Sequence, residues 1–217
     1  MHKKKIVIFG DSLVCGMGIS QEECYGEILK TIYKSEILLE GIPGATIKDG
    51  LAQFNNIRVE NPDGIILAFG LNDVQVRMPF EKSLSKLPNR VSKKTKAIRK
   101  WYLSTFGGYT KVSIEEYKTL LLELIEAIKH EFGAGIDILI CTPTPINALL
   151  FPGTMEKLWE IKKSIIGIGK RYNVQVVDVF EVLSKYKIED ILLEDGKHLN
   201  PYGHKIVAGC ISSYLEE

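Results

Sequence analysis

The segment Lys5-Ile6-Val7-Ile8-Phe9-Gly10-Asp11-Ser12 decides the fold class of this chain. A short apolar run that ends in glycine and polar residues is typical of a buried parallel strand followed by a tight loop. Similar runs alternate with longer segments of helical period, and they predict further strands at 37–40, 65–69, 136–141 and 174–179. We therefore expect an α/β fold, a three-layer α/β/α sandwich with a parallel five-stranded sheet.

In the segments between these strands, apolar residues recur at the spacing of a helix. Helices are expected around 21–34, 47–58 and 155–172, and a strongly amphipathic one is predicted before 136–141 by the spacing of Ile114, Tyr117, Leu121, Leu124, Ile125 and Ile128. The last helix has the clearest start. Asn200 can cap it, and Pro201 suits its first position because no amide hydrogen is needed there.

The composition is that of an ordinary globular protein. The 217 residues are 45% hydrophobic and 25% charged, with a formal net charge of +1, which excludes disordered, collagenous and disulfide-stapled chains. The apolar run behind the basic residues 1–5 is too short for a signal peptide, and no transmembrane segment is expected. The separated cysteines indicate buried, reduced thiols without structural zinc: Cys15, Cys24, Cys141 and Cys210. These features favour a soluble, cytoplasmic protein.

The segment 77–113 departs from the strand and helix alternation. It carries ten Lys or Arg against one acid, Glu81, so its charge is +9, and the rest of the chain, with 18 basic and 26 acidic residues, is at −8. It also contains Trp101, Tyr102, Phe106 and Tyr109, with Gly107-Gly108 as a candidate hinge. The segment is expected to be a basic helical insertion: a solvated excursion, a cap over the site, a surface for an anionic substrate, or a dimer contact. Nucleic acid is not expected as a partner because the remainder is acidic.

Polar residues follow the predicted strands at one edge of the sheet. Gly10-Asp11-Ser12 ends the first strand, the second leads into a loop with Gly44, and Gly70-Leu71-Asn72-Asp73 ends the third. The segment 195–200, with Asp195 and His198, comes after the fifth strand. Because ligands bind beyond the carboxyl ends of parallel strands, these residues are the candidates for a site.

Ser12, His198 and Asp195 can supply nucleophilic catalysis. A serine hydroxyl needs an adjacent base, which a neutral imidazole provides, and a carboxylate holds the imidazole tautomer. With Asp195 three residues before His198, one turn can point both side chains toward Ser12. The backbone amides of Ser12 and Gly44 and the side-chain amide of Asn72 are the candidate donors to the oxyanion that acyl transfer develops.

These residues together resemble the SGNH hydrolase family, also called GDSL esterases and lipases. Its serine, glycine, asparagine and final blocks match, in order, Ser12, Gly44, Asn72 and the pair Asp195 and His198. The resemblance implies a flavodoxin-like fold, a small-molecule ester substrate, no cofactor and no metal. It also implies Ser12 as nucleophile, His198 as base, Asp195 as third member, and Ser12, Gly44 and Asn72 as oxyanion donors.

One position departs from this family pattern. Members often have asparagine two residues before the first glycine of the second block, and Leu39 stands there. Whatever that polar side chain does elsewhere must be done otherwise here or not at all.

Several alternatives apply to single residues. Ser12 could cap a helix, and His198 could be a turn histidine bonded to Asp195. Asp11 and Asp73 could hold magnesium as in haloacid-type phosphatases, although we expect them to bond loop backbone. Gly16 and Gly18 do not make a nucleotide fingerprint because Gln21 replaces the third glycine, and there is no Gly-x-Ser-x-Gly elbow.

The sequence therefore predicts one SGNH hydrolase-like domain over 1–217, with the insertion at about 77–113. The predicted function is a serine esterase that cleaves carboxylic esters through an acyl-enzyme, with acetylated carbohydrate, lysophospholipid and acyl thioester all open as substrates. The alternative is a non-catalytic flavodoxin-like protein that binds an anionic partner through the insertion. A homo-oligomer is also open.

Overall fold

The computed structural model describes residues 4–33, 36–55, 61–80 and 92–215, with the side chains of 92–95 excepted. Parallel strands form one sheet: β1 (Lys5–Gly10), β2 (Glu36–Gly41), β3 (Gly64–Ala68), β4 (Asp137–Cys141) and β5 (Gln175–Val177). Their order, β2-β1-β3-β4-β5, is that of flavodoxin-like doubly wound sheets. The predicted fold class is confirmed.

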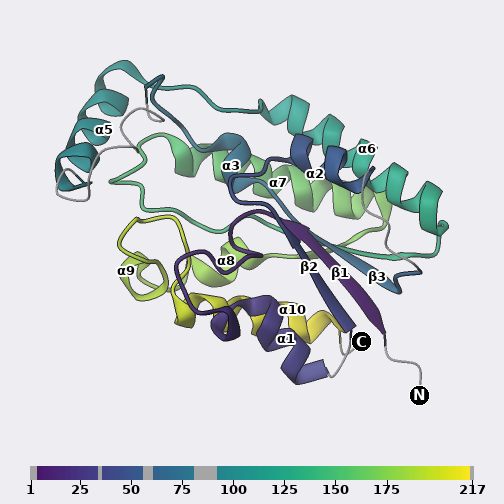
Figure 1. Cartoon of the computed structure of the whole chain (residues 1–217). Helices are drawn as coiled ribbons and strands as arrows, with labels where there is room; N and C mark the ends of the chain where they lie inside the picture. The colour runs from purple at the N-terminus through teal and green to yellow at the C-terminus, as the bar shows by residue number, and fades with distance from the viewer. Residues whose placement is uncertain (1–3, 34–35, 56–60, 81–91, 216–217) are drawn as a thin grey trace.

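Helices cover both faces of the sheet (Figure 1). One layer contains α2 (Ile47–Phe54), α6 (Ile114–Phe132) and α7 (Thr154–Tyr172), and the other contains α1 (Tyr25–Tyr33), α8 (Val179–Leu183), α9 (Ile188–Ile191) and α10 (Pro201–Leu215). Alternate strand residues divide between two apolar cores: Val7 and Ile65 lie in the core under α6, and Ile8 and Ile66 in the core under α10. Because both faces of the sheet are covered, the central strands β1, β3 and β4 are apolar along most of their length.

Two predicted elements are corrected in extent. The fifth strand ends at Val177 and not at 179, because the Asp178 carboxylate accepts a hydrogen bond from the Glu181 amide and caps α8. The predicted helix at 21–34 begins instead as a 3-10 turn, Gln21–Glu23, before α1. The predicted continuation of α2 to residue 58 falls partly on 56–60, outside the described residues.

Side chains cap two long helices, and the predicted start of the last helix is confirmed. The Ser113 hydroxyl accepts from the Glu116 amide at 3.2 Å at the start of α6. At the start of α10 the Asn200 side-chain oxygen accepts from the Gly203 amide at 2.9 Å, with Pro201 as the first helical residue.

The basic segment contains a helix, α5 (Ser92–Phe106), which projects at one end of the molecule (Figure 1). A small apolar cluster of Val76, Met78 and Leu103 attaches α5 to the body. Below it, the backbones of Arg77 and Tyr109 exchange two hydrogen bonds of 2.9 and 3.1 Å. A Cβ on Gly108 would lie 2.6 Å from the Arg77 carbonyl oxygen, so this glycine has a packing role in that contact. The part of the basic segment at 81–91 is outside the described residues.

The prediction that all cysteines are buried is wrong for two of them. All four are free, and Cys24 and Cys141 are buried, but Cys15 is exposed and Cys210 is half-buried. The Cys15 thiol donates to the Gly41 carbonyl oxygen at 2.9 Å, so it ties the loop after β1 to the end of β2. In the described part of the chain, no helix combines the length and the apolar composition needed to cross a membrane.

Candidate active site

The turn that carries Ser12 is fixed by its own backbone and by Asp11. The Asp11 carboxylate accepts from the Leu13 amide at 2.9 Å, and the Ser12 carbonyl accepts from the Met17 amide at 3.0 Å. Gly10 is required at the strand end, because an added Cβ would lie 2.7 Å from the Ala68 carbonyl oxygen. The turn leads to the 3-10 helix at Gln21, so no described helix begins at Ser12 and the capping interpretation is wrong.

Asp195 and His198 form one compact turn before α10. One Asp195 oxygen accepts from the amides of Lys197 and His198, both at 3.0 Å, and the other lies 2.5 Å from His198 Nδ1. Gly196 at φ +76° allows the turn to close. Burial alone would raise the pKa of Asp195, but the hydrogen bonds from His198 outweigh it and hold that pKa well below its usual range.

The histidine also contacts the serine. His198 Nε2 lies 3.0 Å from Ser12 Oγ, and both residues are buried. Because the ionised Asp195 can only accept, His198 Nδ1 carries the proton and Nε2 accepts from the Ser12 hydroxyl. Ser12, His198 and Asp195 therefore form one hydrogen-bonded chain with the polarity that proton removal from Ser12 requires.

Asn72 is joined to the serine turn through Asp11. It lies in a single helical turn, α3 (Leu71–Val74), after β3, and its Nδ2 donates to Asp11 Oδ2 at 2.8 Å. Its Oδ1 accepts from Arg77 Nη2 at 3.3 Å, so both ends of the amide are held. Only one of the two amide hydrogens is needed for Asp11, which leaves the second for an oxyanion. Burial raises the pKa of Asp11 to about 6, although the Leu13 amide, His198 and Asn72 act to lower it.

Gly44 lies in the loop between β2 and α2. This loop starts beside the serine turn, because Gly41 pairs in register with Gly10. Gly44 has φ +78°, and an added Cβ would meet no atom within 4 Å. Its carbonyl accepts from Lys111 Nζ at 2.8 Å. The described contacts thus connect Ser12, His198, Asp195 and Asn72 in one network, whereas those of Gly44 lead to Lys111.

Asp11 and Asp73 bond loop backbone, as expected. Asp73 accepts from the Ile47 amide at 2.8 Å, which ties the asparagine turn to the start of α2, and its second oxygen is buried without a hydrogen-bond partner. Burial raises the pKa of Asp73 to about 7. Among the described residues, no group of three or more His, Cys, Asp or Glu is arranged to hold a metal ion.

Sequence reasoning missed Arg77 and Lys111 as site residues. They stand at the two ends of the basic segment, and each contacts a residue that is predicted to supply an oxyanion donor. Arg77 donates to the side-chain oxygen of Asn72, and Lys111 donates to the carbonyl oxygen of Gly44. The excess of positive charge was visible in the sequence, but the two basic residues that reach the site could not be separated from the other eight.

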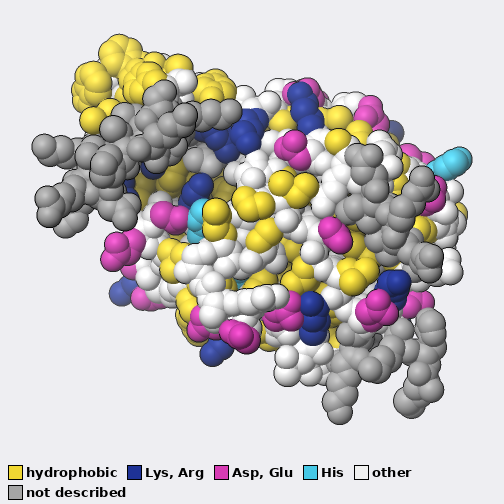
Figure 2. All heavy atoms as spheres, in the orientation of Figure 1, with side chains coloured by type: hydrophobic (Ala, Val, Ile, Leu, Met, Phe, Trp, Pro, Cys, Tyr) yellow, Lys and Arg dark blue, Asp and Glu magenta, His cyan; other side chains and the backbone are white. Residues whose placement is uncertain are grey.

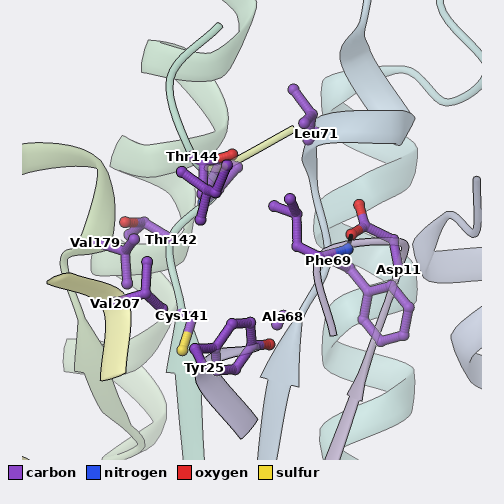
Figure 3. Close-up of a pocket in the computed structure, with 13 residues that line it drawn as sticks. Asp11, Tyr25, Ala68, Phe69, Leu71, Cys141, Thr142, Thr144, Val179 and Val207 are labelled. Carbon is purple, nitrogen blue, oxygen red and sulfur yellow. Dashed lines mark hydrogen bonds between the residues drawn. The ribbon is translucent and has the colours of Figure 1, made fainter. Parts of the chain in front are cut away.

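A small cavity of about 30 Å³ lies behind the site (Figure 3). Asp11 lines it, as do the buried hydroxyls of Tyr25 and Thr144, neither of which has a hydrogen-bond partner. The volume suits one or two water molecules. Ser12 and His198 do not line it, so it is a structural cavity and not the place where substrate meets the serine.

The model of the GDSL-like Lipase/Acylhydrolase family matches residues 8–206. None of the curated proteins matches the chain.

Solved structures share the fold at low identity. A lipase/acylhydrolase from Enterococcus faecalis is 21% identical with a TM-score of 0.69, covering 98% of this chain and 95% of that one. A lipolytic protein of the G-D-S-L family from Veillonella parvula is 17% identical with a TM-score of 0.69, covering 97% of each chain. A catalytic mutant of Axe2, an acetylxylan esterase from Geobacillus stearothermophilus, is also 17% identical with a TM-score of 0.69, covering 98% of this chain and 94% of that one.

Proposed function

The chain belongs to the GDSL-like lipase/acylhydrolase family and is an ester-hydrolysing enzyme, and we propose that it is a serine esterase in which Ser12, His198 and Asp195 perform the reaction. The observation that carries the proposal is the hydrogen-bonded chain from Ser12 Oγ through His198 to Asp195. Family membership also favours the enzyme over the alternative of a non-catalytic binding protein. We further propose that the described elements form one domain, with α5 as an insertion.

The reaction follows from the polarity of this chain. Ser12 Oγ attacks the carbonyl carbon of the ester while its proton passes to His198 Nε2. The tetrahedral intermediate then expels the alcohol, whose oxygen takes the proton back from His198, and an acyl group remains on Ser12. Water, deprotonated by the same nitrogen, attacks the acyl-enzyme. The second tetrahedral intermediate then breaks its bond to Ser12 Oγ, which takes the proton back from His198, and the carboxylic acid is released. Asp195 stays ionised throughout and stabilises the imidazolium that forms in each half of the cycle.

The oxyanion is proposed to receive three hydrogen bonds. The donors are the backbone amides of Ser12 and Gly44 and the second amide hydrogen of Asn72. The low exposure of Ser12 and Asn72, 6% and 7%, strengthens such bonds because little water competes. Arg77, bonded to Asn72 Oδ1, polarises the amide of Asn72, and Lys111, bonded to the carbonyl oxygen of Gly44, holds the loop that carries the Gly44 amide.

Leu39 provides no polar group to this site. Its side chain packs against Gly26 of α1, where an added Cβ would lie 2.4 Å from a Leu39 methyl group. The position that is often asparagine in the family therefore serves the packing of β2 on α1 here.

Labelling with a fluorophosphonate probe tests the proposal, because the probe reacts only with an activated serine. We expect labelling at Ser12 in the folded protein and none in Ser12→Ala. Hydrolysis of nitrophenyl esters of increasing acyl length, run beside acetylated sugars, then separates the substrate classes. Acetylated carbohydrate is included because one structural neighbour is an acetylxylan esterase. Absence of labelling in folded protein would contradict the proposal.

A further inference from the structure

The helix α5 carries apolar side chains on two faces, and only one face is packed. Leu103 is buried against Val76 and Met78. Ile98 and Trp101, three residues apart and roughly opposite Leu103 on the helix, are 41% and 61% exposed. Phe106 at the end of the helix is 64% exposed and contacts the ring of Trp101 at a centroid distance of 5.6 Å. A folded protein has no structural need for this second apolar face.

Positive charge accompanies the exposed rings. The sequence of α5 contains no acid and several cations: Lys93, Lys94, Lys96, Arg99 and Lys100. Lys100, which precedes Trp101 in the sequence, is exposed. Figure 2 shows hydrophobic side chains gathered at the corner of the molecule where Figure 1 draws α5, with Lys and Arg side chains beside them. We call Ile98, Lys100, Trp101 and Phe106 the α5 outer face.

We propose that the α5 outer face docks the protein onto an anionic lipid bilayer. Exposed Trp and Phe rings partition into the interface between headgroups and acyl chains, and nearby Lys and Arg side chains are attracted by the negative surface potential. The charge argues against an α5-to-α5 contact between two copies of this chain, because that contact would bring two acid-free, basic helices together.

The position of α5 gives the docking a consequence for catalysis. Lys96 Nζ donates to the Glu194 carbonyl oxygen at 2.6 Å, and Glu194 precedes Asp195. The other end of the segment is joined to Arg77, which contacts Asn72. A bilayer under the α5 outer face would therefore lie next to the esterase site, and lipid-borne esters would be the substrates presented to Ser12. This second part rests on the proposed function, whereas the docking itself does not.

The two tryptophans of the chain allow a direct test. Trp101 lies on the α5 outer face, whereas Trp159 on α7 is held between Lys162, 4.6 Å from its ring, and the ring of Phe180. Trp159→Phe leaves Trp101 as the single fluorophore, and Trp101→Phe leaves Trp159 as the matched control. With vesicles of phosphatidylcholine and phosphatidylglycerol, we expect a blue shift in the first variant and none in the second.

Co-sedimentation with the same vesicles gives the affinity. Replacing both rings, Trp101→Ser with Phe106→Ser, should weaken binding by about tenfold or more, and added salt should weaken binding of the unaltered chain. The measurements are made in Ser12→Ala protein as well, so that loss of esterase activity and loss of docking are distinguished. Absence of binding, or equal binding by the ring variant, would overturn the proposal. So would a concentration-dependent dimer that Trp101→Ser abolishes, because a second copy would then cover the face.

Discussion

The edge of the sheet that carries Ser12 and the helix α5 hold their side chains in opposite environments. At the edge, Ser12, Asp11 and Asn72 are buried, and each is held by hydrogen bonds from a neighbouring loop. On α5, Trp101 and Phe106 are mostly exposed, and their ring contacts are with each other and with Tyr102 of the same helix. Chemistry needs atoms fixed within tenths of an ångström, whereas recognition of a soft surface needs accessible area. Substitutions at the edge should therefore change turnover, and those on α5 should change what is recognised.

The largest expected effect is the loss of the nucleophile or the base. Ser12→Ala and His198→Ala should each lower kcat for a nitrophenyl ester by about 10⁴–10⁶-fold, and the double variant should lose little more because the residues act as a unit. Exposed residues of the same types, Ser104→Ala on α5 and His130→Ala on α6, are the matched controls. A tenth of the original rate in either folded single variant would show that the assignment is wrong.

Asn72→Ala should have the next largest effect. The amide is proposed to act when the carbonyl oxygen becomes an anion, so kcat should fall by roughly 10²–10³-fold with little change in KM. Steady-state kinetics on one ester measures both constants. A raised KM at unchanged kcat would mean instead that Asn72 holds the substrate in its ground state.

The buried carboxyl of Asp73 should make the free energy of unfolding depend on pH. Its pKa is about 7 in the folded protein against 3.8 unfolded, so between these values the folded chain binds more protons and its stability falls as the pH rises. His204 acts oppositely, because burial lowers its pKa to about 4 and its contribution rises with pH between 4 and 6.5. Between pH 5 and 8, the free energy of unfolding of the original chain should therefore fall by roughly 2 kcal/mol through Asp73, and this fall should be absent in Asp73→Asn. The figure is about half of the free energy that corresponds to the full pKa shift.

Urea unfolding of the original chain and of Asp73→Asn at both pH values measures this difference. If the variant is less stable by the same amount at every pH, the change in its free energy of unfolding with pH can still be compared with that of the original chain. An identical pH dependence in the two proteins would show that Asp73 does not titrate in this window.

The sequence predicted the edge well and the insertion poorly, for a physical reason. Strand ends in a parallel sheet must meet, so Ser12 and Asn72 could be brought together without knowing any side-chain contact. The Asp195 and His198 pair needs only one local turn. By contrast, the contacts of Arg77 and Lys111 depend on how the basic segment folds back, and neither periodicity nor charge encodes that path. Asp178 lies between these two cases. An aspartate is a common helix cap, but this one stands in an apolar run that was assigned to the fifth strand.

Arg77 joins the two regions and should show an intermediate effect. Its guanidinium donates to the carbonyl oxygen and the side-chain oxygen of Gln75 and to Asn72 Oδ1. We therefore expect Arg77 to orient the Asn72 amide and not to contact substrate. Arg77→Gln should lower kcat by about tenfold at nearly constant KM and leave the pH profile unchanged. Arg77→Lys keeps the charge but not the planar fork, and should be only partly active.

Arg171→Gln, at the remote end of α7, is the matched control for loss of a cation. If Arg77→Gln changed KM alone, Arg77 would be a substrate contact and not a positioning residue. Full activity in Arg77→Lys would show that charge, and not the geometry of the fork, is what Asn72 needs.

The smallest expected effect concerns long-range attraction by the exposed lysines of α5. A field from a segment at +9 on a body at −8 should favour the approach of an anionic ester, and salt should screen it because the Debye length is about 8 Å at physiological ionic strength. Lys100→Glu should lower kcat/KM for an anionic ester by roughly twofold to fivefold at low salt, and hardly at all at high salt. A neutral acetyl ester should show neither dependence, and Lys170→Glu on α7, an exposed lysine on another helix, should resemble the original chain. Equal losses on both esters would mean that Lys100 shapes the site itself. In that case α5 would act in turnover, as the edge with Ser12 does, and not only in substrate recognition.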